Sequence, residues 1–366
     1  MSSERVGALP SNAATQPVAD KNSVPRIVAI GGGTGLPNVL RGLRPVLYAD
    51  PDEGHEAADR LVALVATSDD GGSSGRLRAE FNVIPPGDIR NCLAAPSDNH
   101  ERMAELFQYR FGAGDGLNGH AIGNLVLTAL ADVMNDFPRA VELAARVIGA
   151  RGTVLPATSE LVTLVAEFED GRVLSGETAI AAANGRIARV GLIPDRPRCL
   201  PQTCEAILRA QVVVAGPGSL FTSILPPLLV PDVSAAIRAS GATRILVANL
   251  MTEPGETDDY SVLEHVLTIE RHLNAQLFDY VIYNTSPVPE ALAAKYAESG
   301  AKPIVTGNFE LSVLDKLGIQ PIGVPLVSEH PAGKIRHHPE RLAAAILALA
   351  QGKLGAWRTR AEAGGI

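Results

Sequence analysis

The sequence predicts an α/β protein with a Rossmann-like, three-layer fold: a mostly parallel sheet between layers of helices, with a small antiparallel β insertion. Short, wholly apolar runs recur along the chain with helix-length segments between them, which is typical of buried parallel strands. The stretch at about 160–193 differs, because it carries the Asp-Gly and Asn-Gly dipeptides that favour tight hairpins. Four of the apolar runs end in turns rich in glycine and hydroxyl side chains.

The expected elements follow in chain order. IVAI begins the core as a buried strand, and Pro37 suits the first turn of the next helix, which runs to about Leu43. After a loop at 45–60, LVALVAT gives the second strand. Helices are expected at about 100–110, 121–134 and 138–149, strands at 211–215, 244–248, 279–284, 302–305 and 322–327, and a C-terminal amphipathic helix from about Pro339.

One nucleotide-binding domain is expected to span 25–352, with the β insertion inside it. Residues 1–24 are small and polar without periodicity, so they predict a disordered tail, and 353–366 are expected to form a loose C-terminal tail. The chain has 366 residues, of which 46% are hydrophobic, and this is enough to build one large core.

Composition also excludes several classes of function. The net charge is −8 and aromatic residues make up 4%, so we expect no nucleic-acid partner. The N-terminal segment lacks the apolar core of a secretory signal, and no run of about 18 apolar residues predicts a membrane span. The cysteines are Cys92, Cys199 and Cys204, without a CxxC pair, which predicts neither a zinc site nor a disulfide framework and favours a reducing cytoplasm.

The glycine-rich turns carry the functional prediction. They read GGGTG at 31–35, SDDGGSSG at 68–75, GPGSLFTS at 216–223 and NLMTEPGET at 249–257. Ligands of open parallel sheets bind beyond the carboxyl ends of the strands, where backbone amides at helix starts favour phosphate. The turns therefore predict a site for a phosphorylated ligand, although each alone could be a tight turn without one. Leu36 stands where the third glycine of a dinucleotide fingerprint would fall, which disfavours NAD-dependent oxidoreduction.

Acidic residues near these turns suggest more specific chemistry. Asp69 and Asp70 follow the second strand, where an acid can bind a ribose or coordinate Mg²⁺. Asp88, in PPGDIRN, could cap a helix or join them in contacting a metal or ribose. His120 and Asn124, in GHAIGN, are spaced to point the same way from a helix start. Asp88 and His120 are thus the candidate catalytic residues, with a structural role for His120 as the open alternative, and a possible Mg²⁺ would lie at Asp69, Asp70 and Asp88.

The predicted ligand contacts combine backbone amides, hydroxyls, amides and one guanidinium. Ser73 and Ser74 are suited to an anion nest, and Arg78 to a phosphate. From the residues themselves the set is Gly32, Gly33, Thr34, Gly35, Asp69, Asp70, Ser73, Ser74, Arg78, Asn91, Asn124, Gly216, Gly218, Ser219, Asn249 and Thr252.

Taken in order, GGGTG, TSDDGGSSGRLR, PPGDIRN, GHAIGN, GPGSLFTS and NLMTEPGET resemble the gluconeogenesis factor family, within the superfamily of 2-phospho-L-lactate transferase. The resemblance covers about residues 26–350. It implies a Rossmann-like fold, a UDP-sugar such as UDP-N-acetylglucosamine as ligand, and a link to cell shape and cell-wall growth on gluconeogenic carbon sources. It also implies that Tyr296 and Arg336 contact the UDP-sugar.

Two functions follow, and they belong to different classes. The first is a cytoplasmic regulatory protein that binds a nucleotide sugar, with a homodimer and regulators of cell-wall synthesis as the protein partners to consider. The alternative, implied by the transferase resemblance, is Mg²⁺-dependent transfer of a phospho-lactyl-type group from a nucleotide diphosphate donor, with release of a nucleoside monophosphate. We favour binding, because the sequence shows phosphate-binding turns without an evident nucleophile or general base.

Overall fold

The computed structural model describes residues 24–49, 55–95, 101–183, 185–330 and 333–352. Apart from Val24, both predicted tails lie outside these ranges, as does Asn184 of the predicted Asn-Gly turn.

The core is a seven-stranded parallel sheet, as the sequence predicts. Its strand order is β10-β9-β8-β7-β1-β2-β3, so the direction of strand addition reverses between β1 and β7. Such a reversal leaves a crevice at the carboxyl ends of the two strands. The strands are β1 Ile27–Gly31, β2 Leu61–Val65, β3 Thr153–Pro156, β7 Val212–Ala215, β8 Thr243–Val247, β9 Tyr280–Asn284 and β10 Gln320–Val324.

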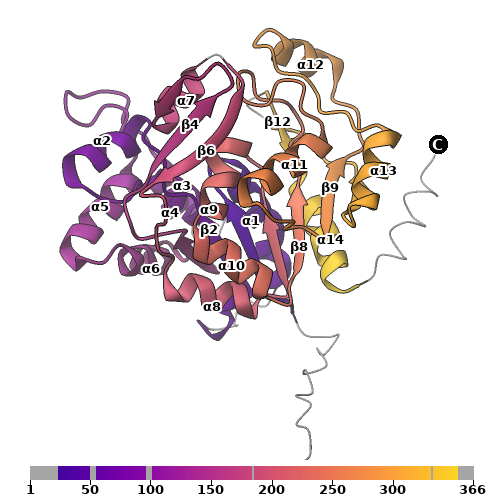
Figure 1. Ribbon diagram of the computed structural model, residues 1–366. Helices are drawn as coiled ribbons and strands as arrows, with labels where there is room; N and C mark the ends of the chain where they lie inside the picture. Colours follow the sequence, from indigo (N-terminus) through magenta and orange to yellow (C-terminus); the bar gives the residue numbers. More distant parts are fainter. Residues whose placement is uncertain (1–23, 50–54, 96–100, 184, 331–332, 353–366) are drawn as a thin grey trace, which may run out of the picture.

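Helices cover both faces of this sheet, which gives the predicted three layers (Figure 1). Along β1, Ile27 and Ala29 belong to one buried cluster, while Val28 and Ile30 belong to the other, which explains the unbroken apolar run. The first cluster includes residues of α1 Gly35–Leu47, α3 Gly87–Leu93, α4 Glu101–Gln108, α5 Ile122–Met134, α6 Phe137–Ile148, α12 Glu290–Ala297 and α14 Pro339–Ala350; the second includes residues of α8 Pro201–Arg209, η2 Leu220–Ile224, α9 Leu225–Leu228, α10 Pro231–Ala239, α11 Val262–Leu273 and α13 Asn308–Lys316.

The insertion folds as the predicted antiparallel sheet. Its strands β4 Thr163–Phe168, β5 Val173–Ser175 and β6 Ile187–Ile193 pair in the order β5-β4-β6. A short helix that the sequence did not predict, α7 Glu177–Ala182, lies between β5 and β6. Leu164, Phe168 and Ile180 bury their side chains in the second cluster, so the insertion packs on the domain rather than forming a separate unit.

Several predicted elements need correction. Residues 302–305 form no strand; Pro303 instead forms an isolated antiparallel bridge with Met251. The strand expected at 322–327 is β10, which ends before Pro325, and a hairpin of β11 Val327–His330 and β12 Lys334–His337 follows it. The loop expected at 45–60 is partly helical: α1 continues to Leu47, and η1 His55–Arg60 precedes β2. The short strand β3 was not predicted.

The expectation of a chain without disulfides was wrong for one pair. Cys199 and Cys204 are joined, five residues apart in sequence. The turn before Pro201, where α8 begins, brings Cys199 back beside the first turn of the helix that carries Cys204. Cys92 is free and buried.

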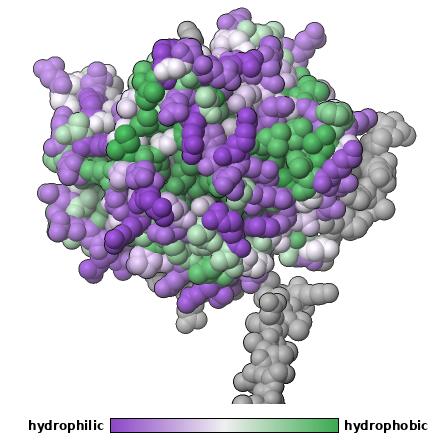
Figure 2. Space-filling view, viewed as in Figure 1, coloured by the Kyte–Doolittle hydropathy of each residue, from purple (hydrophilic) through white to green (hydrophobic). Residues whose placement is uncertain are grey.

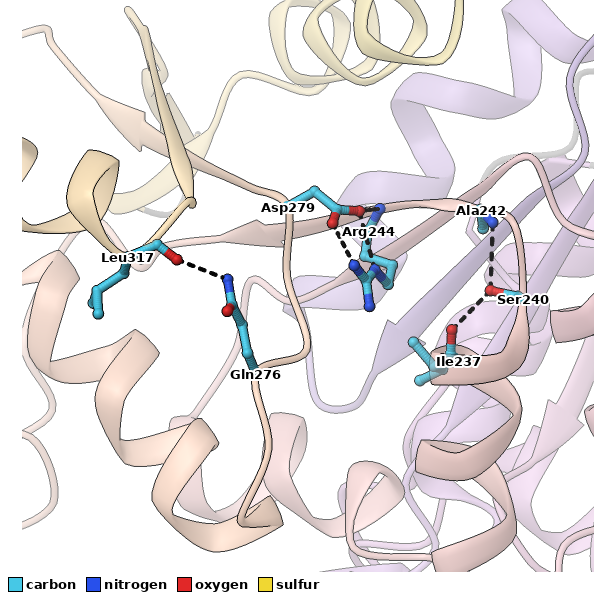
Figure 3. A network of polar contacts seen from close by, with 7 residues as sticks. All are labelled: Ile237, Ser240, Ala242, Arg244, Gln276, Asp279 and Leu317. Carbon is cyan, nitrogen blue, oxygen red and sulfur yellow. Dashed lines mark hydrogen bonds and ion pairs between the residues drawn. The ribbon is translucent and has the colours of Figure 1, made fainter.

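The amino end of the sheet is held by an ion pair far in sequence from the glycine-rich turns. Arg244 at the start of β8 donates from Nε to Asp279 Oδ2 at 3.0 Å, and its Nη2 contacts the second carboxylate oxygen (Figure 3). The Arg244 amide donates to the same carboxylate at 2.9 Å. Asp279 directly precedes β9, so these contacts tie the starts of two neighbouring strands together.

The visible surface is mostly a mixture of hydrophilic and weakly apolar residues, with a hydrophobic area in the region of α11 and α13 (Figure 2). Phe309 and Val305, in α13 and just before it, are 78% and 76% exposed. Within the described ranges, no single helix has the length and apolar character needed to cross a membrane; one bent pair, Leu220–Leu228 with Pro231–Ala239, meets that requirement by length and composition together.

Candidate functional site

A cavity of about 530 Å³ opens where the strand order reverses. Three of the four glycine-rich turns meet there, those at 31–35, 216–223 and 249–257, and α12 and β12 supply the remaining wall. Three of the separate turns therefore border one cavity, whereas the turn at 68–75 contributes no residue to its lining. Of the predicted contacts, the cavity lining contains Gly32, Gly33, Thr34, Gly35, Gly218, Ser219, Asn249, Thr252, Tyr296 and Arg336.

The turn after β1 presents an open helix start to the cavity. Gly33 has a positive φ of 58°, and a Cβ at Gly35 would lie 1.9 Å from the carbonyl oxygen of Pro217. These glycines therefore let the 31–35 and 216–218 turns pack together. Thr34, the N-cap of α1, makes no side-chain capping bond, and Thr34 and Gly35 line the cavity, so the start of α1 borders the cavity with the positive end of its dipole.

The turn after β7 is held by side chains of the loop after β8. Asn249 Oδ1 accepts the Gly218 amide at 3.1 Å, and Asn249 Nδ2 donates to the Gly218 carbonyl at 2.8 Å. Ser219 Oγ accepts the Thr222 amide at 3.2 Å and donates to Glu256 at 2.8 Å. Asn249 and Ser219 thus shape the cavity wall through bonds within the protein. Gly216 supports the turn but does not line the cavity.

The opposite wall is built by α12 and the β11–β12 hairpin. The Tyr296 hydroxyl accepts the Ile335 amide at 3.1 Å, which leaves the ring as the cavity-facing part of the side chain. His337 lines the same wall; its Nε2 lies 3.0 Å from the Ala248 carbonyl, and burial lowers its pKa to about 4, so it is neutral. Arg336 lies between Ile335 and His337 in β12, and it has no carboxylate within ion-pair distance among the described residues.

Several carboxylic acids lie at the cavity or beside the 31–35 turn. Glu177 of α7 lines the cavity, and burial together with the charges of Asp69 and Asp88 raises its pKa to about 9. Burial raises the pKa of Asp88 to about 6, although the Gly33 amide donates to its Oδ2 at 2.6 Å. Glu253 has a pKa raised to about 7 by burial and by Glu256. These acids resist ionising together, so their proton content changes across the neutral pH range.

The oxygen donors in this group are of the kind that Mg²⁺ prefers, but the protein alone does not complete a metal site. Among the described residues, no group of three or more His, Cys, Asp or Glu side chains is placed to hold a metal ion. Asp70 Oδ1 accepts the Thr178 amide and hydroxyl, both at 2.8 Å, and Asp69 Oδ1 accepts the Gly71 amide at 2.8 Å. Magnesium is commonly held by one or two carboxylates with substrate phosphates and water, and Asp69 and Asp88 suit that mode.

His120, Ser73 and Asn124 lie behind the cavity rather than in it. His120 is 5% exposed, and its Nδ1 lies 3.0 Å from Ser73 Oγ. Asn124 Nδ2 also donates to Ser73 Oγ at 3.0 Å. His120 therefore cannot touch a cavity ligand from this position.

Arg90, which sequence reasoning missed, connects that group to the phosphate turn. Its Nη1 donates to Asn124 Oδ1 at 3.1 Å and its Nη2 to Asn91 Oδ1 at 2.7 Å, while Asn91 Nδ2 donates to the Gly33 carbonyl at 3.4 Å. Ser74 Oγ accepts the Gly87 amide at 3.1 Å and so fixes the start of α3. Asp88 is not a cap of that helix, because its carboxylate turns to Gly33 instead.

The remaining predicted contacts lie elsewhere. Arg78 donates to Thr163 Oγ1 at 2.9 Å and, with Asp70, faces a separate cavity. Glu177 could not be found from the sequence, because only the folded insertion brings α7 to the phosphate turn. A signal for Arg90 did exist: it lies inside the PPGDIRN motif between two predicted contacts.

Comparison with known proteins places the chain in a family. A model for 2-phospho-L-lactate transferase CofD matches residues 27–327. A putative gluconeogenesis factor of Nostoc sp. is 45% identical over 325 residues, covering 88% of this chain and 68% of that protein. The gluconeogenesis factor of Bacillus subtilis is 40% identical over 325 residues, covering 89% of this chain and 98% of that protein.

A solved structure agrees with these relatives. The crystal structure of a UPF0052 family protein from Bacillus halodurans matches with a TM-score of 0.80 and 39% identity, covering 88% of this chain and 99% of that one. Sequence and fold therefore agree with the resemblance seen in the motifs. The chain belongs to the gluconeogenesis factors of the 2-phospho-L-lactate transferase (CofD) family.

Proposed function

We propose that this protein is a cytoplasmic regulatory protein that binds a nucleotide sugar of the UDP-N-acetylglucosamine type, and that it acts in cell shape and cell-wall growth under gluconeogenic conditions. The observation that carries the proposal is the open start of α1 at the strand reversal, facing a cavity of about 530 Å³. A cavity of this size suits a small-molecule ligand. The names of the relatives support the gluconeogenic role.

The two walls suggest how the ligand would lie. The amides of Thr34 and Gly35 would hold the pyrophosphate, because a helix start combines unpaired N–H groups with the positive end of the dipole. Arg336 would add a charge-assisted bond to the same group. The Tyr296 ring would stack on the uracil or the sugar, since its hydroxyl is already bonded to Ile335.

Binding without turnover is favoured by the position of the histidines. His120 is buried behind the cavity, and the neutral His337 uses its Nε2 on a backbone carbonyl. Neither histidine is placed to move a proton to or from a ligand in the cavity. The proposed protein partners are a second copy of the chain, in a homodimer, and regulators of cell-wall synthesis.

Isothermal titration calorimetry with UDP-N-acetylglucosamine tests the proposal. We expect saturable binding, and we expect Arg336→Gln to weaken it at least about tenfold, because a hydrogen bond to a charged group contributes about 1.5–3 kcal/mol. Arg146→Gln, on the outer helix α6, is the matched control and should bind like the unaltered protein. A folded protein that gives no heat at millimolar ligand would contradict the proposal.

A second candidate function is nucleotide-diphosphate-dependent group transfer. It is favoured by the family model and by the acids Asp69, Asp88 and Glu177 beside the phosphate turn. Magnesium held by Asp69 and the ligand would neutralise phosphate charge, and Asp88, through the oxygen that does not accept the Gly33 amide, would accept the proton of an acceptor hydroxyl as the nucleoside monophosphate leaves. The test is Mg²⁺-dependent release of a nucleoside monophosphate across nucleotide donors and deazaflavin acceptors. No release from any pair would leave only the binding function.

A further inference from the structure

A second cavity, of about 430 Å³, lies between α2 Gly72–Phe81 and the start of β4. Its lining includes Asp70, Arg78, Asn82, Leu161 and Thr163, and none of these lines the cavity at the strand reversal. The core domain and the insertion therefore each supply one wall. Arg78 and Asp70 were singled out in the TSDDGGSSGRLR motif, yet the proposed nucleotide site uses neither side chain.

Opposite charges face this cavity without meeting. Asp70 and Arg78 are both partly exposed, and they form no ion pair with each other or with any other described residue. The Arg78 guanidinium has five N–H donors, of which one group, Nη2, donates to the Thr163 hydroxyl at 2.9 Å. The other donors remain for a carboxylate or phosphate, which a guanidinium binds in a forked geometry.

Asp70 is held in place so that one of its oxygens remains available. The amide and hydroxyl of Thr178 both donate to Oδ1 at 2.8 Å. Gly176, with a positive φ of 96°, gives the carboxylate its room, because a Cβ there would lie 2.2 Å from Oδ2. A fixed carboxylate with a free oxygen accepts a hydrogen bond from a hydroxyl or an amine.

We propose that this second cavity binds a small molecule with a carboxylate or phosphate at one end and a hydroxyl or amino group at the other. The anionic end lies on Arg78, the hydroxyl or amino end lies on Asp70, and Leu161 contacts the carbon chain between them. This site is distinct from the nucleotide site, and the inference does not depend on which nucleotide binds there. One short segment borders both cavities, since Thr178 holds Asp70 and its neighbour Glu177 lines the first cavity.

The competing explanation is that Arg78 only fastens the insertion to α2 through Thr163. A purely structural Arg78 would affect the unfolding transition and would show no preference among small ligands. The experiment therefore compares a probe that carries both groups with probes that carry one.

The test is a titration of the full chain, followed by ¹H–¹⁵N spectra, with phosphoethanolamine, 3-aminopropyl phosphate, inorganic phosphate and ethanolamine. We expect one of the two-group probes to shift the amides of Asn82 and Thr163 saturably and to bind at least about tenfold more tightly than phosphate or ethanolamine alone. Arg78→Gln should weaken that probe at least about tenfold. Asp70→Asn should remove its advantage over phosphate without weakening phosphate binding.

Arg76→Gln is the matched control, because Arg76 lies on the same helix and its Nη2 bonds to the Asn118 carbonyl outside this cavity. It should bind the probes like the unaltered protein, and a thermal melt of each variant confirms folding. Two-group probes that bind no better than phosphate would mean an adventitious ion only, and would overturn the proposal. Equal binding by the Arg78→Gln and Arg76→Gln variants would also overturn it. Neither result bears on nucleotide binding.

Discussion

At the scale of single residues, Asp88 sets the charge of the phosphate turn. Its carboxylate already accepts the hydrogen bond of the Gly33 amide. An ionised Asp88 therefore repels an anionic ligand at the turn that would otherwise attract it. Burial raises the Asp88 pKa to about 6, so this charge is removed within the range in which proteins are commonly studied. Because the folded-state pKa lies above the ordinary value, Asp88 favours the folded state at low pH, and that contribution is lost as the pH rises through about 6.

This predicts that affinity for UDP-N-acetylglucosamine in metal-free buffer rises as the pH falls through about 6. Asp88→Asn should raise the affinity at pH 7.5 about tenfold, which corresponds to about 1.4 kcal/mol, and should reduce the pH dependence. Some dependence should remain, because Glu253, which lines the cavity, has a pKa raised to about 7. Calorimetry at several pH values measures this, with Asp132→Asn on α5 as the control. An affinity that is lower in Asp88→Asn at every pH would show that the carboxylate assists the ligand.

Glu177 leads to a second residue-scale prediction. Burial and neighbouring acids raise its pKa to about 9, so it is protonated at neutral pH and its charging favours unfolding as the pH rises toward 9. Glu177→Gln, which resembles the protonated acid, should already be more stable than the unaltered protein at pH 6, because the unfolded chain ionises this acid above about pH 4.5, and its advantage should grow between pH 6 and pH 9. Urea unfolding at both pH values measures the difference. Equal losses in the two proteins would show that Glu177 is ionised at neutral pH.

At the scale of elements, α3 joins the phosphate turn to α5. Arg90 passes beneath the start of α5, where a Cβ at Gly123 would lie 2.7 Å from Arg90 Cγ. Gly123, the second glycine of GHAIGN, therefore leaves room for the Arg90 side chain. Arg90 donates to Asn91, and Asn91 in turn donates to the Gly33 carbonyl.

Gly123→Ala should displace Arg90, lower the unfolding free energy by about 1–3 kcal/mol as overpacking does, and weaken nucleotide binding through the turn. Gly112→Ala is the matched control, since a Cβ there meets nothing within 4 Å. Denaturant unfolding and calorimetry measure the two effects. Unchanged nucleotide binding in a destabilised Gly123→Ala protein would show that the Arg90–Asn91 contacts do not affect the nucleotide site.

The same elements show what the sequence could predict. The strands of the sheet are short and apolar on both faces, so β1, β2, β7, β8 and β9 were recognisable. The Asp-Gly and Asn-Gly dipeptides predicted the antiparallel insertion. β3 was missed because its four residues, TVLP, are buried only alternately and form no wholly apolar run, and α7 because it is one short helix between two predicted hairpin strands. Local patterns indicate that an element exists, but they do not state which elements will meet.

At the scale of the whole molecule, the strand order decides which residues become ligand contacts. The turns after β1 and β7 lie together because those strands are neighbours, and of the predicted set the cavity lining contains Gly32, Gly33, Gly35, Gly218, Asn249 and Thr252. Ser73 and Asn124 are polar residues in equally suggestive motifs, yet they do not line the cavity and instead hydrogen-bond to each other. The acid Glu177 enters the cavity only through the insertion. Such long-range placement cannot be derived from local spacing.

The two ends of the sheet also differ in role. The Arg244–Asp279 pair lies at the amino ends of β8 and β9, opposite the site (Figure 3). Arg244→Met should lower the unfolding free energy by about 1 kcal/mol, because the pair is partly exposed, and should leave ligand affinity unchanged. Thermal unfolding with calorimetry on the same samples measures both. A changed affinity would mean that the two ends are coupled.

The most direct test of the account is a crystal structure of the chain with UDP-N-acetylglucosamine. We predict that the pyrophosphate lies within hydrogen-bond distance of the Thr34 and Gly35 amides, with Arg336 on the phosphates and the Tyr296 ring against the uracil or sugar. A nucleotide bound away from the reversal between β1 and β7, with the start of α1 left without an anion, would contradict it.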